Sequence, residues 1–97
     1  MTRRVVVRPE ARDELFDAQR WYEERAQGLG REFAEAINQI IGRIASDPAQ
    51  FPCVHGDTRR AVLARFPYAV SFRDASDRVV VLAVHGRQDP SRWQTRG

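Results

Sequence analysis

A stripe of apolar residues at helical spacing runs through the middle of the chain and constrains its fold more than any other feature. The members recur at i, i+4, i+7, i+8 and i+11 and so share one face of an α-helix: Phe33, Ile37, Ile40, Ile41 and Ile44. Polar residues occupy the other side, and Asp47-Pro48 follows, where proline cannot continue a helix. We therefore predict an amphipathic helix over residues 30–46, whose apolar face needs a second layer to cover it.

A weaker helical pattern precedes this stripe. Pro9 suits the first turn of a helix, and acidic residues occupy the turns that follow it: Glu10, Asp13, Glu14 and Asp17. Apolar residues then recur at helical spacing: Ala11, Leu15, Ala18 and Tyr22. We expect a helix over residues 9–25, turned by the glycines of Gln27–Gly30 into an antiparallel helical hairpin. Upstream, the β-branched residues of Arg4–Arg8 predict a short strand.

Three runs rich in β-branched and aromatic residues follow the helices, over residues 58–64, 68–73 and 78–85. The connections between them are short, so neighbouring strands should be antiparallel. In the second run apolar residues alternate with small or polar ones, which predicts one buried face. The third contains Val79–Val84, apolar on both faces, and is predicted to be the central strand. Residues 47–57, with two prolines and a glycine, should form an irregular connection.

This order of elements predicts one α+β domain over residues 1–97, with the order β-α-α-β-β-β. The N-terminal strand and the helical hairpin should pack with a small, mainly antiparallel sheet, and 97 residues suit a single domain. The longest apolar run has six residues, whereas a membrane span needs about 20. The lone Cys53 excludes an internal disulfide, and the first residues include too few apolar ones for a signal peptide. We therefore expect a soluble, cytoplasmic protein.

Charge divides the chain into two unlike halves. All 16 basic residues are arginines, and the formal net charge is +3. Residues 1–48 hold eight arginines and nine acidic residues, whereas residues 49–97 hold eight and four. The helical half and the strand half should therefore have different partners. An arginine-rich sheet suits an acidic protein segment, with direct binding of nucleic acid as the alternative.

Several short sequence motifs follow one another along the chain. They are Pro9–Leu15, Trp21–Arg25, Gly30–Phe33, Ile44–Pro48 with Phe51-Pro52, Arg59–Val70, and His85–Pro90 followed by Trp93. No single motif is specific for one protein family. Their combination, which spans Val5 to Trp93, resembles the toxins of the RelE/ParE superfamily, the toxic halves of bacterial type II toxin–antitoxin modules.

The superfamily divides by activity. RelE-like members cut messenger RNA in the ribosome, using basic residues of the sheet and usually a tyrosine near the C-terminus. ParE-like members are not known as nucleases and poison DNA gyrase, the topoisomerase that supercoils DNA. This chain has no lysine, its last tyrosine is Tyr68 inside the predicted strand over residues 68–73, and Trp93 stands in the tail. It therefore resembles the ParE-like, or plasmid-stabilisation, branch.

That resemblance implies a noncatalytic inhibitor of DNA gyrase, without a cofactor, that a cognate antitoxin neutralises. A RelE-like nuclease and a non-toxic binding module of the same fold are the alternatives. For a nuclease the candidate residues are His85, Arg73 and Arg87, because arginine can stabilise phosphate charge but cannot accept the 2′-hydroxyl proton. His85 and Arg73 each end a predicted strand, which predicts a cluster of imidazole and guanidinium groups. We favour a structural role for His85.

No metal site is predicted, because Cys53 and His55 would supply only two of the four ligands of a zinc site. The antitoxin should bind an apolar groove between hairpin and sheet, flanked by strand arginines, through an acidic amphipathic segment. Adjacent Trp21 and Tyr22 cannot both face one core, so one should be buried and the other should lie at the groove edge. The residues assigned to antitoxin binding are Leu15, Phe16, Trp21, Tyr22, Arg60 and Arg73. Arg87 and Trp93 are assigned to target binding.

Overall fold

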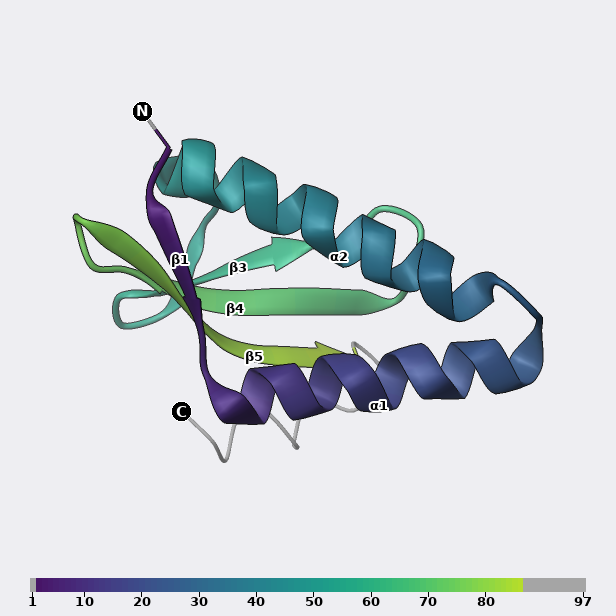
Figure 1. The fold of residues 1–97 in the computed structure, drawn as a ribbon. Coiled ribbons are helices and arrows are strands. Elements are labelled where there is room, and N and C mark those ends of the chain that lie inside the picture. The colour runs from purple at the N-terminus through teal and green to yellow at the C-terminus, as the bar shows by residue number, and fades with distance from the viewer. Residues whose placement is uncertain (1, 87–97) are drawn as a thin grey trace.

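Two helices and five strands account for most of residues 2–86, the part of the chain that this computed structural model describes. They follow one another in the order β-α-α-β-β-β-β, with a 3-10 helix, η1, before the second strand (Figure 1). The elements are β1 Arg4–Val7, α1 Pro9–Arg25, α2 Leu29–Ser46, η1 Pro48–Gln50, β2 Cys53–His55, β3 Thr58–Val62, β4 Tyr68–Asp74 and β5 Arg78–Gly86. The predicted α+β class, both helices and the N-terminal strand are confirmed.

The turn between the helices depends on two glycines and a carboxylate. Gly28 adopts a left-handed φ of 86°, which glycine takes without strain, and α2 begins at the next residue. Glu23 accepts hydrogen bonds of 3.0 Å from the backbone amides of both Gly28 and Gly30, which lie at the start of α2 where helical acceptors are missing. At Gly30 the helices are so close that an added Cβ would lie 2.5 Å from the carbonyl oxygen of Gln19.

The sheet is mixed, with the strand order β1-β5-β4-β3-β2. β1 runs parallel to β5, and every other neighbouring pair is antiparallel, as the short connections predict. β4 therefore lies in the middle, and β5 lies between β1 and β4. The prediction that Val79–Val84 forms the central strand is wrong by one position, because β2 adds a strand at the far edge of the sheet.

β2 is the element that corrects the prediction for residues 47–57. Cys53–His55 is a strand rather than part of an irregular connection, and it pairs antiparallel with the start of β3. Cys53 lies opposite Arg59 and His55 opposite Thr58, with an irregular register between the two pairs. All three residues of β2 are exposed, so no alternation of apolar and polar residues marks it in the sequence. Its pairing with β3 is what makes it a strand.

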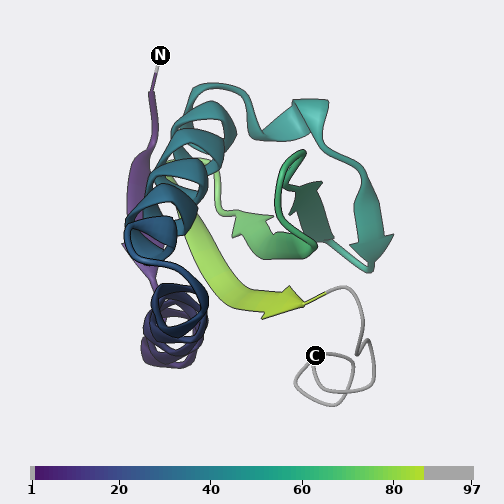
Figure 2. The same ribbon diagram turned by 90° about the vertical axis from the view of Figure 1, so that its right-hand side faces the viewer.

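The helical hairpin packs on one side of the sheet, with α2 over the strands and α1 along β5, so the core lies between the hairpin and the strands (Figure 2). The predicted stripe of α2 is confirmed as the centre of this core: Phe33, Ile37 and Ile44 are fully buried, Ile40 nearly so and Ile41 in part. The strands contribute Val70, Phe72, Val79 and Val81, which are also fully buried. No helix within residues 2–86 has the length and apolar character that crossing a membrane requires.

The face of β4 that was predicted to be buried is buried at Val70 and Phe72, but the opposite face is partly buried as well. Ala69 and Ser71 point away from the helices, and both are nonetheless buried. Each is small and lies between longer side chains of the neighbouring strands, with Val62 and His85 beside Ala69 and Arg60 beside Ser71. The sheet face without helices therefore combines buried small residues with longer side chains around them.

Candidate functional site

The sheet face that carries no helix brings several candidate residues to one surface. The strand register places Arg60 and Val62 of β3, Ser71 and Arg73 of β4 and His85 of β5 on this side, which we call the open sheet face. Their neighbours along each strand point into the core, because successive side chains of a strand alternate between its faces. The open sheet face thus carries arginines on two adjacent strands.

His85 lies at the end of β5 and is held in place rather than presented to solvent. Only 5% of its surface is exposed, and its Nε2 lies 2.9 Å from the hydroxyl oxygen of Ser71 on β4. This hydrogen bond joins two strands across a separation of 14 residues. The geometry supports the structural role that we favour for His85.

The predicted cluster of His85 with Arg73 does not form. β4 and β5 are antiparallel, so their C-terminal ends lie at opposite ends of the pair: His85 is opposite Ala69, whereas Arg73 is opposite Val80. Val80 and His85 lie five positions apart on β5, which corresponds to roughly 16 Å along a strand. Arg60, directly opposite Ser71, is the arginine that the register brings toward the histidine.

Trp21 and Tyr22 divide as predicted, with one ring inside and one outside. Tyr22 is 8% exposed and packs against Phe33 and Phe66, with ring centroids 5.1 and 5.0 Å away. Burial raises the pKa of the Tyr22 hydroxyl above its ordinary value of 10.0, and the neighbouring Tyr68 adds to this. Trp21 is 47% exposed, and the Arg25 guanidinium lies over its ring at 3.9 Å.

Leu15 and Phe16 divide in the same way. Leu15 packs against the core, whereas Phe16 is 51% exposed. Phe16 and Trp21 are five positions apart, which separates them by about 140° around the helix axis. The two exposed rings therefore lie on opposite flanks of α1 and do not form one apolar patch.

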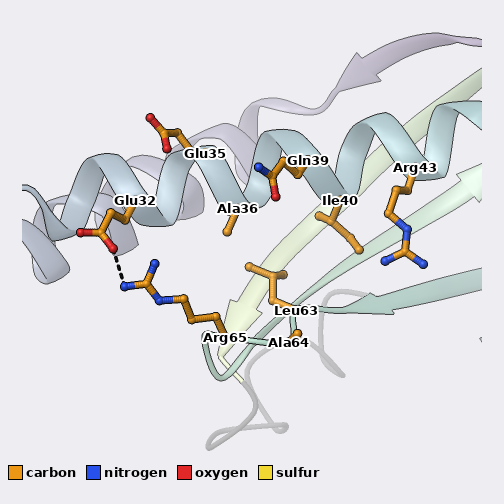
Figure 3. A pocket seen from close by; sticks show the side chains of 9 residues that line it. All are labelled: Glu32, Glu35, Ala36, Gln39, Ile40, Arg43, Leu63, Ala64 and Arg65. Carbon is orange, nitrogen blue, oxygen red and sulfur yellow. Dashed lines mark ion pairs between the residues drawn. The ribbon is translucent and has the colours of Figure 1, made fainter.

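A groove between hairpin and sheet is present, but α2 and the segment that follows β3 line it rather than the aromatic residues of α1 (Figure 3). Its volume is about 280 Å³. The lining residues are Glu32, Glu35, Ala36, Gln39, Ile40, Arg43, Leu63, Ala64 and Arg65, and we call the space the α2–β3 groove. Sequence reasoning missed the groove because four of its nine lining residues belong to the polar side of the amphipathic helix and three others meet α2 only through tertiary packing.

The α2–β3 groove has an apolar centre and charged ends. Ile40 and Leu63 contribute nearly buried side chains to it. At one end Arg65 forms an ion pair with Glu32 that joins the sheet to α2 (Figure 3). Near the other end Arg43 donates a hydrogen bond of 3.2 Å to the Gln50 side chain. This combination suits a ligand with an apolar group between polar or charged groups.

Comparison with known proteins agrees with the family resemblance that the sequence motifs indicate. Over 93 residues the chain is 30% identical to toxin ParE2 of Mycobacterium tuberculosis, in strains CDC 1551 / Oshkosh and H37Rv. The alignment covers 94% of this chain and 89% of the relative. The chain belongs to the ParE-like toxins of the RelE/ParE superfamily. No protein-family model matches it.

Solved structures share the fold of this ParE-like chain. A chain of the chromosomal ParDE toxin–antitoxin system from P. aeruginosa matches with a TM-score of 0.75 at 16% identity, over 88% of this chain and 96% of that one. A chain of the toxin–antitoxin complex RelBE2 from Mycobacterium tuberculosis matches with a TM-score of 0.58 at 20% identity, over 90% and 100%. At these identities the likeness concerns the fold.

The comparisons identify the family of this ParE-like toxin and do not assign roles to its individual residues. Arg87 and Trp93, assigned to target binding, lie outside the described residues. Residues 2–86 contain no group of three or more His, Cys, Asp or Glu side chains placed to bind a metal ion. The candidate surfaces within them are the open sheet face, the exposed rings of α1 and the α2–β3 groove.

Proposed function

We propose that this ParE-like toxin acts in the cytoplasm as a noncatalytic inhibitor of DNA gyrase and is held inactive by a cognate antitoxin. The observation that carries the noncatalytic part is the state of His85. A general acid or base must come within hydrogen-bonding reach of the proton that it transfers. His85 is 5% exposed and its Nε2 is engaged by Ser71, so the imidazole is poorly placed to reach an RNA 2′-hydroxyl.

The separation of Arg73 from His85 supports the same conclusion. A nuclease site needs its proton-transfer group and its phosphate-binding cation within a few ångströms of one reacting group. Arg73 and His85 lie at opposite ends of the β4–β5 pair, opposite Val80 and Ala69. Arginines spread over the sheet in this way suit binding of an acidic partner better than cleavage of a phosphodiester.

An antitoxin partner is supported by the solved structures of similar fold, which are described as a ParDE system and a RelBE2 toxin–antitoxin complex. Of the residues assigned to antitoxin binding, Phe16 and Trp21 are about half exposed, and Arg73 is exposed on β4. We propose that Trp21 and Arg73 contact the antitoxin together with Arg60, and that Phe16, on the opposite flank of α1 from Trp21, lies outside this contact. Leu15 and Tyr22, as parts of the core, would position the exposed rings rather than bind.

The target is tested by expressing the toxin without antitoxin in a bacterial host. Gyrase inhibition predicts DNA breaks, filamentous cells and intact messenger RNA, together with loss of supercoiling by purified gyrase. The matched variant is His85→Gln, which retains size and hydrogen bonding but cannot transfer a proton near neutral pH. We expect a folded His85→Gln protein to remain toxic. Loss of toxicity at unchanged thermal stability would contradict the noncatalytic assignment.

The second candidate function is a ribosome-dependent messenger RNA endonuclease. The observation in its favour is that Arg60 lies opposite Ser71, whose hydroxyl contacts His85, so a cation and an imidazole approach one another on the open sheet face. In the same experiment this candidate predicts rapid loss of ribosome-bound messages with undamaged DNA. It also predicts that His85→Gln abolishes toxicity.

A further inference from the structure

The open sheet face continues across β5 onto β1, at the edge of the sheet opposite β2. Arg4 and Val6 point to this face, because the alternate residues of β1 pack against the core. The parallel register places Val6 beside Val80 of β5, and the antiparallel register places Val80 beside Arg73 of β4. Two arginines and two valines from three adjacent strands thus share one surface, which we call the β1 end of the open sheet face.

The charge of this surface has a single sign. The strands β1, β3, β4 and β5 contain one acidic residue, Asp74, and the register places it opposite Val79, on the face toward the core. Arg4 and Arg73 are both exposed, and neither forms an ion pair with another of residues 2–86. Both guanidinium groups are therefore available to an anionic partner.

The two arginines flank an exposed apolar side chain. Arg4 and Arg73 lie two strands and two residues apart in the register, which corresponds to roughly 12 Å between their Cα atoms. The Val6 side chain lies between them and is 37% exposed. Arg78, which is next to Arg4 in the register, already pairs with Asp77. The surface therefore offers one apolar contact between two available cations.

We propose that the β1 end of the open sheet face binds an acidic segment of the antitoxin, with one carboxylate at Arg4, another at Arg73 and an apolar side chain over Val6. This inference rests on the proposed function, because it specifies how far the antitoxin contact extends across the toxin. Alternate residues of an extended segment share one side, and four residues span about 13 Å. An apolar residue with an acidic residue two positions before and after it matches this spacing. Arginine can bind each carboxylate through two parallel hydrogen bonds.

The valine and the small number of cations select this occupant over two others. A nucleic-acid backbone is anionic, but it would leave the exposed Val6 side chain without an apolar contact. Its affinity also depends on the number of phosphates neutralised, and two arginines would neutralise only about two. A second copy bound through the same face would bring like charges together without a carboxylate between them. A segment with both carboxylates and an apolar side chain satisfies the whole surface.

The test measures the affinity of the full-length toxin for the full-length antitoxin of the same module by calorimetry. Arg4→Gln and Arg73→Gln each remove one carboxylate contact. We expect binding about fivefold weaker for each and about twenty-fold weaker or more for both together, because the two contacts are separate. The matched control is Arg12→Gln, which removes an exposed arginine one helical turn from Phe16, on the flank of α1 outside the contact. It should bind almost normally.

Two further measurements separate charge from apolar contact. The affinity of the wild-type toxin should fall as salt rises, and that of the variant with both arginines replaced should fall less steeply. Val6→Thr retains the shape of the side chain but replaces a methyl group by a hydroxyl. We expect it to weaken binding about threefold and to leave the salt dependence unchanged. Thermal unfolding verifies that these variants fold, as expected for exposed positions.

Each outcome decides. If either Arg4→Gln or Arg73→Gln binds as tightly as wild type, the contact at two arginines is wrong, whereas neutralisation by the antitoxin stands. A folded wild-type toxin that does not bind this antitoxin overturns both. If the same substitutions abolish binding of a DNA duplex to free toxin but not binding of the antitoxin, the surface belongs to nucleic acid and the inference is wrong. Self-association of free toxin that Val6→Thr abolishes would assign the surface to a second copy, with the same consequence.

Discussion

α1 and α2 have nearly the same length, 17 and 18 residues, yet they bury very different apolar surfaces. α2 directs a continuous stripe of large residues at the sheet, and most of that stripe is fully buried. The buried residues of α1 are Ala11, Ala18 and Tyr22, of which only Tyr22 is large. Phe16 and Trp21 remain about half exposed. The comparison indicates that α2 supplies most of the buried apolar surface of the hairpin, whereas α1 leaves two large rings accessible.

The position of α1 explains the difference. β1 ends with Val7 opposite Val81, while β5 continues to Gly86. α1 lies along this uncovered part of β5, where the Glu14 carboxylate accepts a hydrogen bond of 3.0 Å from the Val84 amide. A helix at the edge of a sheet buries only the narrow side that meets the sheet and its partner helix. Its remaining surface stays available.

The largest expected effect is on stability and comes from α2. Ile37→Ala should lower the free energy of unfolding by about 2–5 kcal/mol, because it removes a fully buried side chain and leaves a cavity. The matched change on α1, Phe16→Ala, should cost less than about 0.5 kcal/mol because the ring is half exposed. Chemical denaturation of both variants measures the difference. Similar losses in the two variants would refute the division of roles between the helices.

The second prediction concerns the contact between the helices. In Gly30→Ala the new Cβ would lie 2.5 Å from the Gln19 carbonyl oxygen, so the backbones must move apart. We expect a loss of roughly 1–3 kcal/mol. Gly42→Ala is the control within the same helix, because its Cβ meets nothing within 4 Å. It should raise stability by about 0.5–1 kcal/mol through helix propensity alone. Thermal unfolding would show shifts of opposite sign, and a stable Gly30→Ala protein would mean that the contact is loose.

The third prediction uses the one large buried residue of α1. The folded protein raises the pKa of Tyr22 above 10.0, chiefly through burial, so the neutral hydroxyl is favoured in the folded state. The stability that this contributes is fully present below the unfolded pKa and is lost as the pH rises through the folded pKa. Unfolding free energy should therefore fall above pH 10 in wild type and fall less steeply in Tyr22→Phe. Parallel curves for the two proteins would contradict the buried position of this hydroxyl.

The sequence was sufficient for the helices because their signals are local. The apolar period of α2 and the turn at Gly28 lie within one stretch of chain, and both match the structure. β2 was not predictable in this way, because its three exposed residues become a strand only through pairing with β3. The hydrogen bond of His85 likewise could not be read from the local sequence, because its partner Ser71 lies 14 residues earlier on another strand.

The predicted cluster of Arg73 and His85 failed for a different reason. The antiparallel pairing of the two strands was correctly predicted. In such a pair, however, the last residue of one strand lies far from the last residue of the other. The α2–β3 groove could not be found from apolar patterns, since its lining combines polar residues of α2 with the segment that follows β3. The adjacency of Ala64 and Arg65 to α2 is a result of tertiary packing.

The last prediction combines a small effect on stability with a large effect on binding, and it tests whether α1 contacts the antitoxin. Trp21→Ala should cost less than about 1 kcal/mol, because the half-exposed ring loses mainly its contacts with Arg25 and the edge of Tyr22. Antitoxin affinity, measured by calorimetry, should nevertheless fall about tenfold or more, as expected for an exposed aromatic anchor beside an arginine.

Trp21 lies seven positions after Glu14, on the flank of α1 that meets β5, whereas Phe16 lies on the other flank. Phe16→Ala is therefore the control, and we expect it to bind almost normally. Equal losses in both variants would place the antitoxin across the whole exposed side of α1. Full affinity in both would remove α1 from the interface and reduce the contrast between the helices to one of stability alone.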